Sequence, residues 1–166
     1  KTLDLISYLS IKPKEVILIN SSSTDNTSDL INEWIENSNI KMFKNIFKNT
    51  FLPSTSKNVG VHLAQSEYIA FMDCDLNFKS DWILDQYTAL TKNNLDVVFG
   101  NVMLKGNSIF DISCVAHTYG YEKINECVPG TILKKSCFKV TGDFLNHRAG
   151  YDPQWRKEVK KKLKYG

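Results

Sequence analysis

Short apolar segments recur along the chain and are separated by amphipathic ones. Residues 15–20 (EVILIN), 68–72 (YIAFM) and 95–102 (LDVVFGNV) are almost continuously apolar and rich in β-branched side chains. Such runs are typical of strands that are covered on both faces of a sheet. We therefore expect each of these three segments to form a buried strand.

The segments between these strands carry apolar residues at helical spacing. The predicted helices are 1–11, which ends before Pro13; 25–36, with Leu30, Ile31, Trp34 and Ile35; 54–66, opened by Ser56; and a helix after Ser80 or Asp81 with Ile83, Leu84, Tyr87 and Leu90. Further expectations are a strand at 40–44 and, within 130–144, a short strand, a short helix and a glycine turn.

Alternating strands and helices predict an α/β fold, with a mostly parallel sheet flanked by helices. In such sheets ligands bind beyond the carboxyl ends of the strands. The polar segments 20–27 (NSSSTDNT) and 73–77 (DCDLN) both follow apolar strands. They should therefore lie near each other at one edge of the sheet.

The composition suits one folded domain. The chain has 166 residues, 42% of them hydrophobic, and a net charge of only +3, which disfavours a dedicated nucleic-acid binder. The four cysteines are widely spaced, so a zinc site is not expected and reduced thiols in the cytoplasm are the default. No signal peptide or apolar run of membrane-spanning length is present. The basic segment 156–166 is expected to be a solvated helix end, with at most peripheral contact with a membrane.

Two aspartates, Asp73 and Asp75, follow the strand 68–72 directly. Residues i and i+2 of an extended chain share one side, so their carboxylates would form a concentrated negative site that a cation must neutralise. Oxygen ligands of this kind select Mg²⁺ or Mn²⁺, which proteins usually hold with one or two carboxylates and substrate phosphates. The competing interpretation is that both are ordinary polar residues that cap the next helix.

Three other polar segments have both a structural and a functional interpretation. In 19–30, Ser23, Thr24 or Asp25 would cap a helix, while Asn20 and Ser21 could bond a nucleotide. Lys57 and Asn58 open a helix and could reach the same ligand, or could be a surface lysine and a cap. In 147–159, Asp152 would cap a helix or act as a general base, Trp155 is expected to be a packing residue, and His147 and Arg148 are phosphate candidates.

Together these segments resemble the family 2 glycosyltransferases of GT-A fold. EVILINSSSTDNT is similar to the family's strand followed by D-D-G-S-T-D-G-T, and STSKNVGVHLAQSEYIAFMDCD to its A-R-N-x-G and F-x-D-x-D segments. GTILKKSCFKVTGDF is similar to the segment that ends in G-G-F, and RAGYDPQW to the R-A-G-E-D-x-x-W region. The match covers nearly the whole chain.

The resemblance implies an inverting, hexosyltransferase-type enzyme of polysaccharide biosynthesis that uses a nucleotide-diphospho-sugar donor and Mn²⁺ or Mg²⁺. It implies one catalytic domain over 1–166, with a nucleotide-sugar-binding half at 1–100 and an acceptor-side half at 101–166. Asp152 would be the catalytic base, and Asp73 and Asp75 the metal ligands. The nucleotide-sugar contacts would be Asn20, Ser21, Ser23, Asp25, Lys57, Asn58, Asp73 and Cys74. The acceptor could be a glycan, a lipid or a protein, at a cytoplasmic site that includes the inner face of the membrane.

The sequence departs from the family pattern at three places. Asn20 replaces the first acidic residue after the strand, and Tyr151 replaces the glutamate before Asp152. The family's first strand has no counterpart, so we expect a central strand to be missing before Lys1 and one flank of 15–20 to be unpaired. These departures keep alternatives open: a catalytically degenerate nucleotide-sugar-binding domain, a sugar-phosphate nucleotidyltransferase, or an interaction domain.

Overall fold

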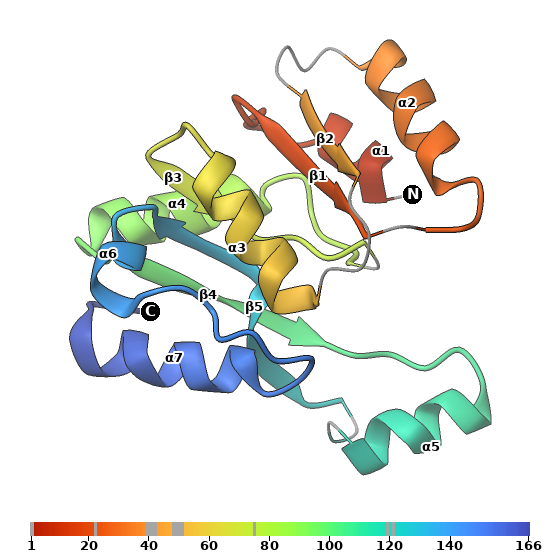
Figure 1. Cartoon of the computed structure of the whole chain (residues 1–166). Helices are drawn as coiled ribbons and strands as arrows, with labels where there is room; N and C mark the ends of the chain where they lie inside the picture. The colour runs from red at the N-terminus through yellow and green to blue at the C-terminus, as the bar shows by residue number, and fades with distance from the viewer. Residues whose placement is uncertain are drawn as a thin grey trace.

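The computed structural model describes residues 2–21, 23–38, 43–47, 52–74, 76–118, 120 and 122–166, with only the backbone given at 43–47 and 118. Seven helices and five strands are found in these ranges (Figure 1). They are α1 (Thr2–Ser7), β1 (Val16–Asn20), α2 (Thr27–Asn37), β2 (Phe43–Phe47), α3 (Pro53–Leu63), β3 (Tyr68–Ala70), α4 (Trp82–Lys92), β4 (Val97–Met103), α5 (Ile109–Thr118), β5 (Ile124–Lys134), α6 (Cys137–Thr141) and α7 (Tyr151–Lys162).

The strands form two sheets. β1 and β2 pair in parallel, whereas β3, β5 and β4 form a three-stranded sheet in that order. β5 is antiparallel to both of its neighbours, so β3 and β4 point the same way and β5 is the exception. The expected α/β fold with flanking helices is confirmed. The expectation of mostly parallel pairing needs a correction in the second sheet, because β5 enters between two strands that run in the opposite direction.

Several element boundaries differ from the sequence predictions. α3 begins at Pro53 and not at Ser56, because a proline fits the first turn of a helix, where its missing N–H costs nothing. The strand expected at 40–44 is found at Phe43–Phe47, and its first part lies outside the described residues. β5 starts at Ile124 and is longer than the short strand expected within 130–144.

The core lies between the second sheet and α7. Trp155 and Val159 of α7 are buried together with Phe99, Val128 and Leu133 of the sheet. Three phenylalanines extend this contact. The rings of Phe138 and Phe144 lie 5.3 and 4.9 Å from the Trp155 ring, and Phe71 packs in turn against both phenylalanines. The prediction that Trp155 is a packing residue is confirmed, and its burial fixes the helix that carries Asp152 against β5.

A large cavity separates the two sheets. It has a volume of about 1480 Å³ and is lined by β1, β3 and helices α1 to α4, including Ile17, Leu18 and Ile69. Among the described strands, β1 pairs only with β2 and β3 only with β5, so one flank of each strand faces this cavity. Figure 1 shows the two sheets as separate layers, with α3 beside both of them.

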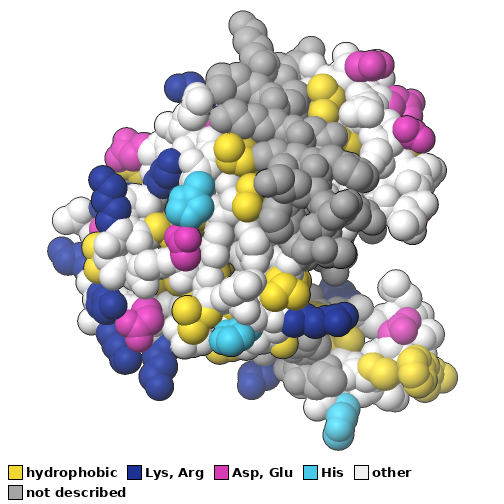
Figure 2. Space-filling model, in the orientation of Figure 1, with side chains coloured by type: hydrophobic (Ala, Val, Ile, Leu, Met, Phe, Trp, Pro, Cys, Tyr) yellow, Lys and Arg dark blue, Asp and Glu magenta, His cyan; other side chains and the backbone are white. Residues whose placement is uncertain are grey.

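β4 and β5 extend beyond the rest of the sheet and carry α5 at their far end (Figure 1). α5 exposes apolar side chains: Ile109 is 86% exposed and Phe110 is 76% exposed. Figure 2 shows these apolar side chains at the tip of the projecting arm. In the described part of the chain, no helix has both the length and the apolar character needed to cross a bilayer.

Candidate active site

The amino end of α3 brings Lys57 to the loop that follows β3. Lys57 Nζ lies 2.9 Å from Asp73 Oδ1, and it lies 5.8 Å from the centre of the Tyr151 ring. The Lys57 side chain is only 13% exposed. Burial lowers the pKa of Lys57, but the Asp73 carboxylate and Tyr151 outweigh burial and leave this pKa above its ordinary value. Lys57 is therefore a fixed cation that faces the first aspartate of the Asp73–Asp75 pair.

Hydrogen bonds to the chain between α6 and α7 hold α3 in place. Asn58 Nδ2 donates to the Phe144 carbonyl at 2.8 Å, and Asn58 Oδ1 accepts from the Phe144 N–H at 2.9 Å. The Ser54 hydroxyl donates to the His147 carbonyl at 3.0 Å. Both ends of the Asn58 amide are thus engaged by backbone. The sequence prediction that Asn58 contacts a nucleotide stays a prediction, and its geometry favours a structural role.

The carboxyl end of β1 meets the start of α3 through Ser21 and Ser56. Asn20 is buried, donates to the Ser28 hydroxyl at 3.2 Å and accepts from the Ser23 N–H at 3.0 Å. The Ser21 hydroxyl lies 3.1 Å from the Ser56 hydroxyl, and Ser56 lines the cavity. Asn20 therefore shapes the turn after β1, and Ser21 reaches the edge of the cavity.

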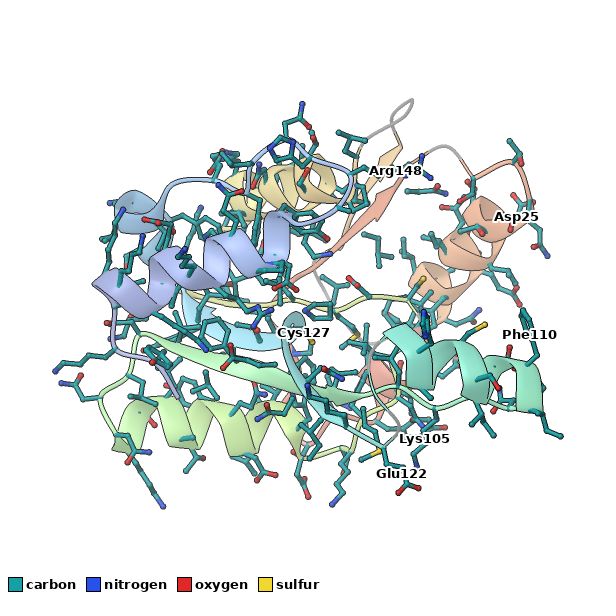
Figure 3. The ribbon with its side chains drawn as sticks, turned by 90° about the horizontal axis from the view of Figure 1, so that it is seen from below. Asp25, Lys105, Phe110, Glu122, Cys127 and Arg148 are labelled. Atoms are coloured by element: carbon teal, nitrogen blue, oxygen red, sulfur yellow. The ribbon has the colours of Figure 1, made fainter. Side chains whose placement is uncertain are left out.

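Asp25 lies apart from this group. Its Oδ1 atom accepts the Thr27 N–H at 3.0 Å, which helps to start α2 without Asp25 occupying the cap position. The hydrogen bonds from Thr27 lower the pKa of Asp25. In Figure 3 Asp25 lies beside α2, well away from Cys127 at the centre of the molecule. The structure assigns Asp25 a local role at the helix start and does not bring it to the other candidate residues.

The first turn of α7 holds Asp152 against β5. Asp152 Oδ2 accepts the Val128 N–H at 2.9 Å, and Asp152 Oδ1 accepts a hydrogen bond from Arg156 Nε, one helical turn further along. Gly150 precedes the helix with φ of 81°, a left-handed conformation that glycine adopts without strain. The carboxylate is therefore fixed on both oxygens, although each oxygen can accept a further hydrogen bond.

Cys127 connects the two acidic regions electrostatically. Burial, together with the charges of Asp152 and Asp73, raises the pKa of the Cys127 thiol to about 11. The thiol therefore stays protonated at neutral pH. Cys74, by contrast, is exposed, and its carbonyl accepts a hydrogen bond from the Thr2 hydroxyl. All four cysteines are free.

The cavity is lined by only some of the residues that the sequence singles out. Lys57, Asp73, Cys74 and Tyr151 line it directly, while Asp152 follows Tyr151 in the chain. His147 and Arg148 are exposed, and Figure 3 shows Arg148 on the loop before α7. Asp75 lies outside the described residues.

The donor set suits a cation shared with a substrate. The described residues contain no group of three or more His, Cys, Asp or Glu side chains that could form a metal cage. Asp73 is 41% exposed at the cavity and is bonded to Lys57 through only one oxygen. Mg²⁺ and Mn²⁺ need only one or two protein carboxylates when phosphates complete the shell. Asp73, with Asp75 two residues on, fits that requirement.

Sequence reasoning missed Arg156, Glu126 and Cys127. The spacing of Asp152 and Arg156, four residues apart on one helix, is a signal that could have identified the pair. Glu126 and Cys127 carry no such signal, because they reach Asp152 only through the position of β5 beside α7.

Comparison with known proteins agrees with this geometry. The family model described as "Glycosyl transferase family 2" matches residues 1–158. An uncharacterized glycosyltransferase of Haemophilus influenzae is 34% identical over 99 residues, which cover 57% of this chain and 39% of that protein. A poly-beta-1,6-N-acetyl-D-glucosamine synthase of Staphylococcus epidermidis is 27% identical over 155 residues, covering 85% of this chain and 37% of that protein.

Solved structures share the fold. TarS 1-349 of S. aureus superposes with a TM-score of 0.69 at 17% identity, over 98% of this chain and 51% of that one. The mannosyltransferase PcManGT of Pyrobaculum calidifontis gives a TM-score of 0.72 at 16% identity, over 99% of this chain and 48% of that one. This chain thus spans well under half of those two curated relatives and about half of the solved structures. The fold is GT-A, and the chain belongs to glycosyl transferase family 2.

Proposed function

We propose that this domain transfers a hexosyl group from a nucleotide-diphospho-sugar to an acceptor hydroxyl, with inversion and with a divalent metal. The observation that carries the proposal is that Lys57 lies between the two acidic regions. Lys57 pairs with Asp73 at 2.9 Å in the cavity, and it lies 5.8 Å from the ring of Tyr151, which directly precedes Asp152 in α7. A departing diphosphate needs a positive charge that stabilises it, and an acceptor hydroxyl needs a carboxylate that takes its proton.

Related structures support the choice of donor. PcManGT was solved in complex with GDP-Man and Mn²⁺, and TarS 1-349 in complex with UDP-GlcNAc. Both belong to the fold of this chain and superpose over nearly all of it. A nucleotide-diphospho-sugar is therefore the donor class to test first. The remaining candidates for contacts with the nucleotide of this donor are Asn20, Ser21, Ser23 and Cys74.

In this mechanism the residues of the chain act on the negative charge of the leaving diphosphate and on the proton of the acceptor hydroxyl. Lys57 supplies a fixed positive charge beside Asp73, where the negative charge of a leaving diphosphate would grow. Asp152 keeps a lone pair on each oxygen after its two hydrogen bonds, so it can accept the proton of an attacking hydroxyl. A metal held by Asp73 and Asp75 would, when bound, add a Lewis acid at the diphosphate.

Inversion at the anomeric carbon follows from the roles proposed for Asp152 and for the diphosphate site. One base and one leaving-group site define a single displacement, in which the acceptor oxygen bonds the anomeric carbon as the bond to the diphosphate breaks. The proton goes to Asp152, and the nucleoside diphosphate departs with the bonding electrons. Polysaccharide synthesis at a cytoplasmic site is the setting we propose, with any membrane contact limited to the basic end of the chain.

Transfer assays with matched variants test this function. We expect release of nucleoside diphosphate from a panel that includes UDP-GlcNAc and GDP-Man, with Mn²⁺ present, and loss of release with EDTA. Asp73→Asn and Asp75→Asn should abolish the response to Mn²⁺, and Asp152→Asn should lower kcat by about 10²–10⁴-fold. Asp85→Asn, on the exposed face of α4, is the control and should leave the rate unchanged. Equal rates with Mn²⁺, with EDTA and in Asp75→Asn would exclude the mechanism.

A second candidate is a nucleotide-sugar-binding domain without turnover. Two observations favour it: Tyr151 stands where the family has a glutamate, and Asp152 is already bonded through both oxygens. Calorimetry that detects donor binding, in the absence of any transfer, would support this candidate. Release of pyrophosphate from a nucleotide triphosphate would instead identify a nucleotidyltransferase.

A further inference from the structure

Arg156 bridges two carboxylates on different elements. Its Nε donates to Asp152 Oδ1 on the same helix, and its Nη1 donates to Glu126 Oε1 on β5 at 2.9 Å. All three side chains are mostly buried, with 20% exposed for Arg156 and Asp152 and 29% for Glu126. A guanidinium can do this because its planar fork presents several donors at fixed angles.

Glu126 has a second cationic partner. Lys160 Nζ lies 2.8 Å from Glu126 Oε1 and also lies over the Tyr165 ring, 5.4 Å from its centre. Asp152, Arg156, Glu126 and Lys160 therefore form a row of alternating charge. Burial raises the pKa of Glu126, but Lys160 and Arg156 outweigh burial and bring it below its ordinary value, so Glu126 is ionised at neutral pH.

We propose that Arg156 is a positioning residue for Asp152, and that Glu126 limits how strongly Arg156 stabilises the ionised Asp152 carboxylate. The inference deepens the proposed function, since it rests on Asp152 as the group that takes the acceptor proton. Arg156 and the Val128 N–H each hold a different oxygen, so the carboxylate cannot rotate. Glu126 accepts a hydrogen bond from the same guanidinium, so Arg156 divides its donors between two carboxylates.

The direction of each effect follows from electrostatics. A cation beside a carboxylate favours its ionised form, and a second anion opposes it. Removing Arg156 should therefore make Asp152 easier to protonate, and neutralising Glu126 should make it harder. A purely structural role for either residue predicts no such opposite pair of effects.

Four further titratable groups belong to this region of the site. Cys127 is protonated over the range of interest because its pKa lies at about 11. Asp73 is paired with Lys57, and Lys57 keeps its proton because its pKa lies above the ordinary value. Tyr151 precedes Asp152 and is near Lys57. Arg156, Glu126 and Lys160 are therefore the groups whose removal should dominate the ionisation of Asp152.

The test follows the ¹³C resonance of the Asp152 side-chain carboxyl against pH, in the full chain labelled at aspartate. Asp152→Asn identifies the resonance. In Arg156→Met we expect the titration midpoint to rise by about one pH unit or more, and in Glu126→Gln we expect it to fall. Arg156→Lys keeps the charge without the fork and should lie between wild type and Arg156→Met. Lys157→Met removes an exposed charge from the same helix and should leave the midpoint in place.

Midpoints that move in the same direction in Arg156→Met and Glu126→Gln, or that move no more than in Lys157→Met, would overturn the inference. Should Arg156→Met fail to fold, the nearly isosteric Glu126→Gln and the charge-preserving Arg156→Lys still decide it.

Transfer kinetics separate the two proposals. Opposite midpoint changes without transfer by the wild type would refute the proposed function alone. Transfer with unchanged midpoints would refute the role of Arg156 alone. If both hold, Arg156→Met should lower kcat more than it changes the KM for the donor.

Discussion

At the scale of single residues, the site contains two kinds of side chain. Some side chains face the cavity, and others anchor the helix that carries them. Lys57 and Asp73 face the cavity and pair with each other at 2.9 Å. Asn58, the next residue after Lys57, instead binds the Phe144 backbone with both ends of its amide. The helical turn places these neighbours on different faces, so one can meet a ligand while the other anchors the helix.

This division predicts a specific outcome for Asn58→Ala. The variant leaves the Phe144 N–H and carbonyl without their partner, so the free energy of unfolding should fall by about 1–3 kcal/mol. Urea unfolding measures the loss, with Asn107→Ala at an exposed turn as the control. Donor affinity, measured by calorimetry on the folded protein, should stay within about twofold, a change of only a few tenths of a kcal/mol. A tenfold weaker donor with unchanged unfolding would instead assign Asn58 to the nucleotide site.

At the scale of elements, the β4–β5 ladder sets the position of Asp152. The register shifts between Val98 and Gly100, where β5 approaches β4 closely. A Cβ atom at Gly100 would lie 2.0 Å from the Pro129 carbonyl oxygen, which is too close for any side chain. Val128, which binds Asp152 through its N–H, directly precedes Pro129. The absence of a side chain at position 100 therefore allows β5 to present that N–H to α7.

Two glycines with different surroundings provide a matched comparison. Gly100→Ala should destabilise the protein by about 1–3 kcal/mol, because the backbone must shift to admit the methyl group. Gly60→Ala, inside α3 with nothing within 4 Å of the new Cβ, should stabilise it by about 0.5–1 kcal/mol. Thermal unfolding of both variants measures the difference. Equal effects of the two substitutions would contradict the close approach of β4 and β5.

At the scale of the whole molecule, the cavity between the two sheets dominates. It lies between one flank of β1 and one flank of β3 and is lined largely by apolar side chains, with the Lys57–Asp73 pair also on its wall. Strand flanks of this kind can pair with other chains unless they are covered. The unpaired flank expected for 15–20 is therefore found, within the described residues, and a second one at β3 accompanies it.

An apolar cavity that solvent can enter should bind a fluorescent apolar dye. We expect the folded chain to enhance the fluorescence of 8-anilinonaphthalene-1-sulfonate, as exposed apolar surfaces do. Leu30→Glu, on α2 in the cavity wall, should reduce this signal because it places a negative charge there, which repels the sulfonate of the dye. Leu84→Glu alters a leucine that is 39% exposed on α4, outside the residues that line the cavity, and is the control. A signal that both variants reduce equally would place the dye elsewhere.

The sequence by itself determined most of the elements and their order, although not α5 or the start of β5. Apolar runs and helical spacing predicted β1, β3, β4, α2 and α4, because these patterns reflect burial along one chain segment. The motif around Asp73 and the region around Asp152 indicated the family, which the match over residues 1–158 confirms. The rule that strand ends share an edge also predicted that the segments after β1 and β3 would lie near each other. In the structure each of them contacts the start of α3, Ser21 at Ser56 and Asp73 at Lys57.

Only the tertiary structure decided which side chains meet across those elements. The antiparallel entry of β5 could not be read from its composition, because strand direction depends on which neighbours the strand finds and not on its own residues. The same entry brings the Val128 N–H to Asp152 and Glu126 to Arg156, partners that lie 24 and 30 residues apart along the chain. Pairing, charge balance and burial are properties of contacts between distant segments. A sequence pattern records the preferences of each segment, and the fold determines the partners.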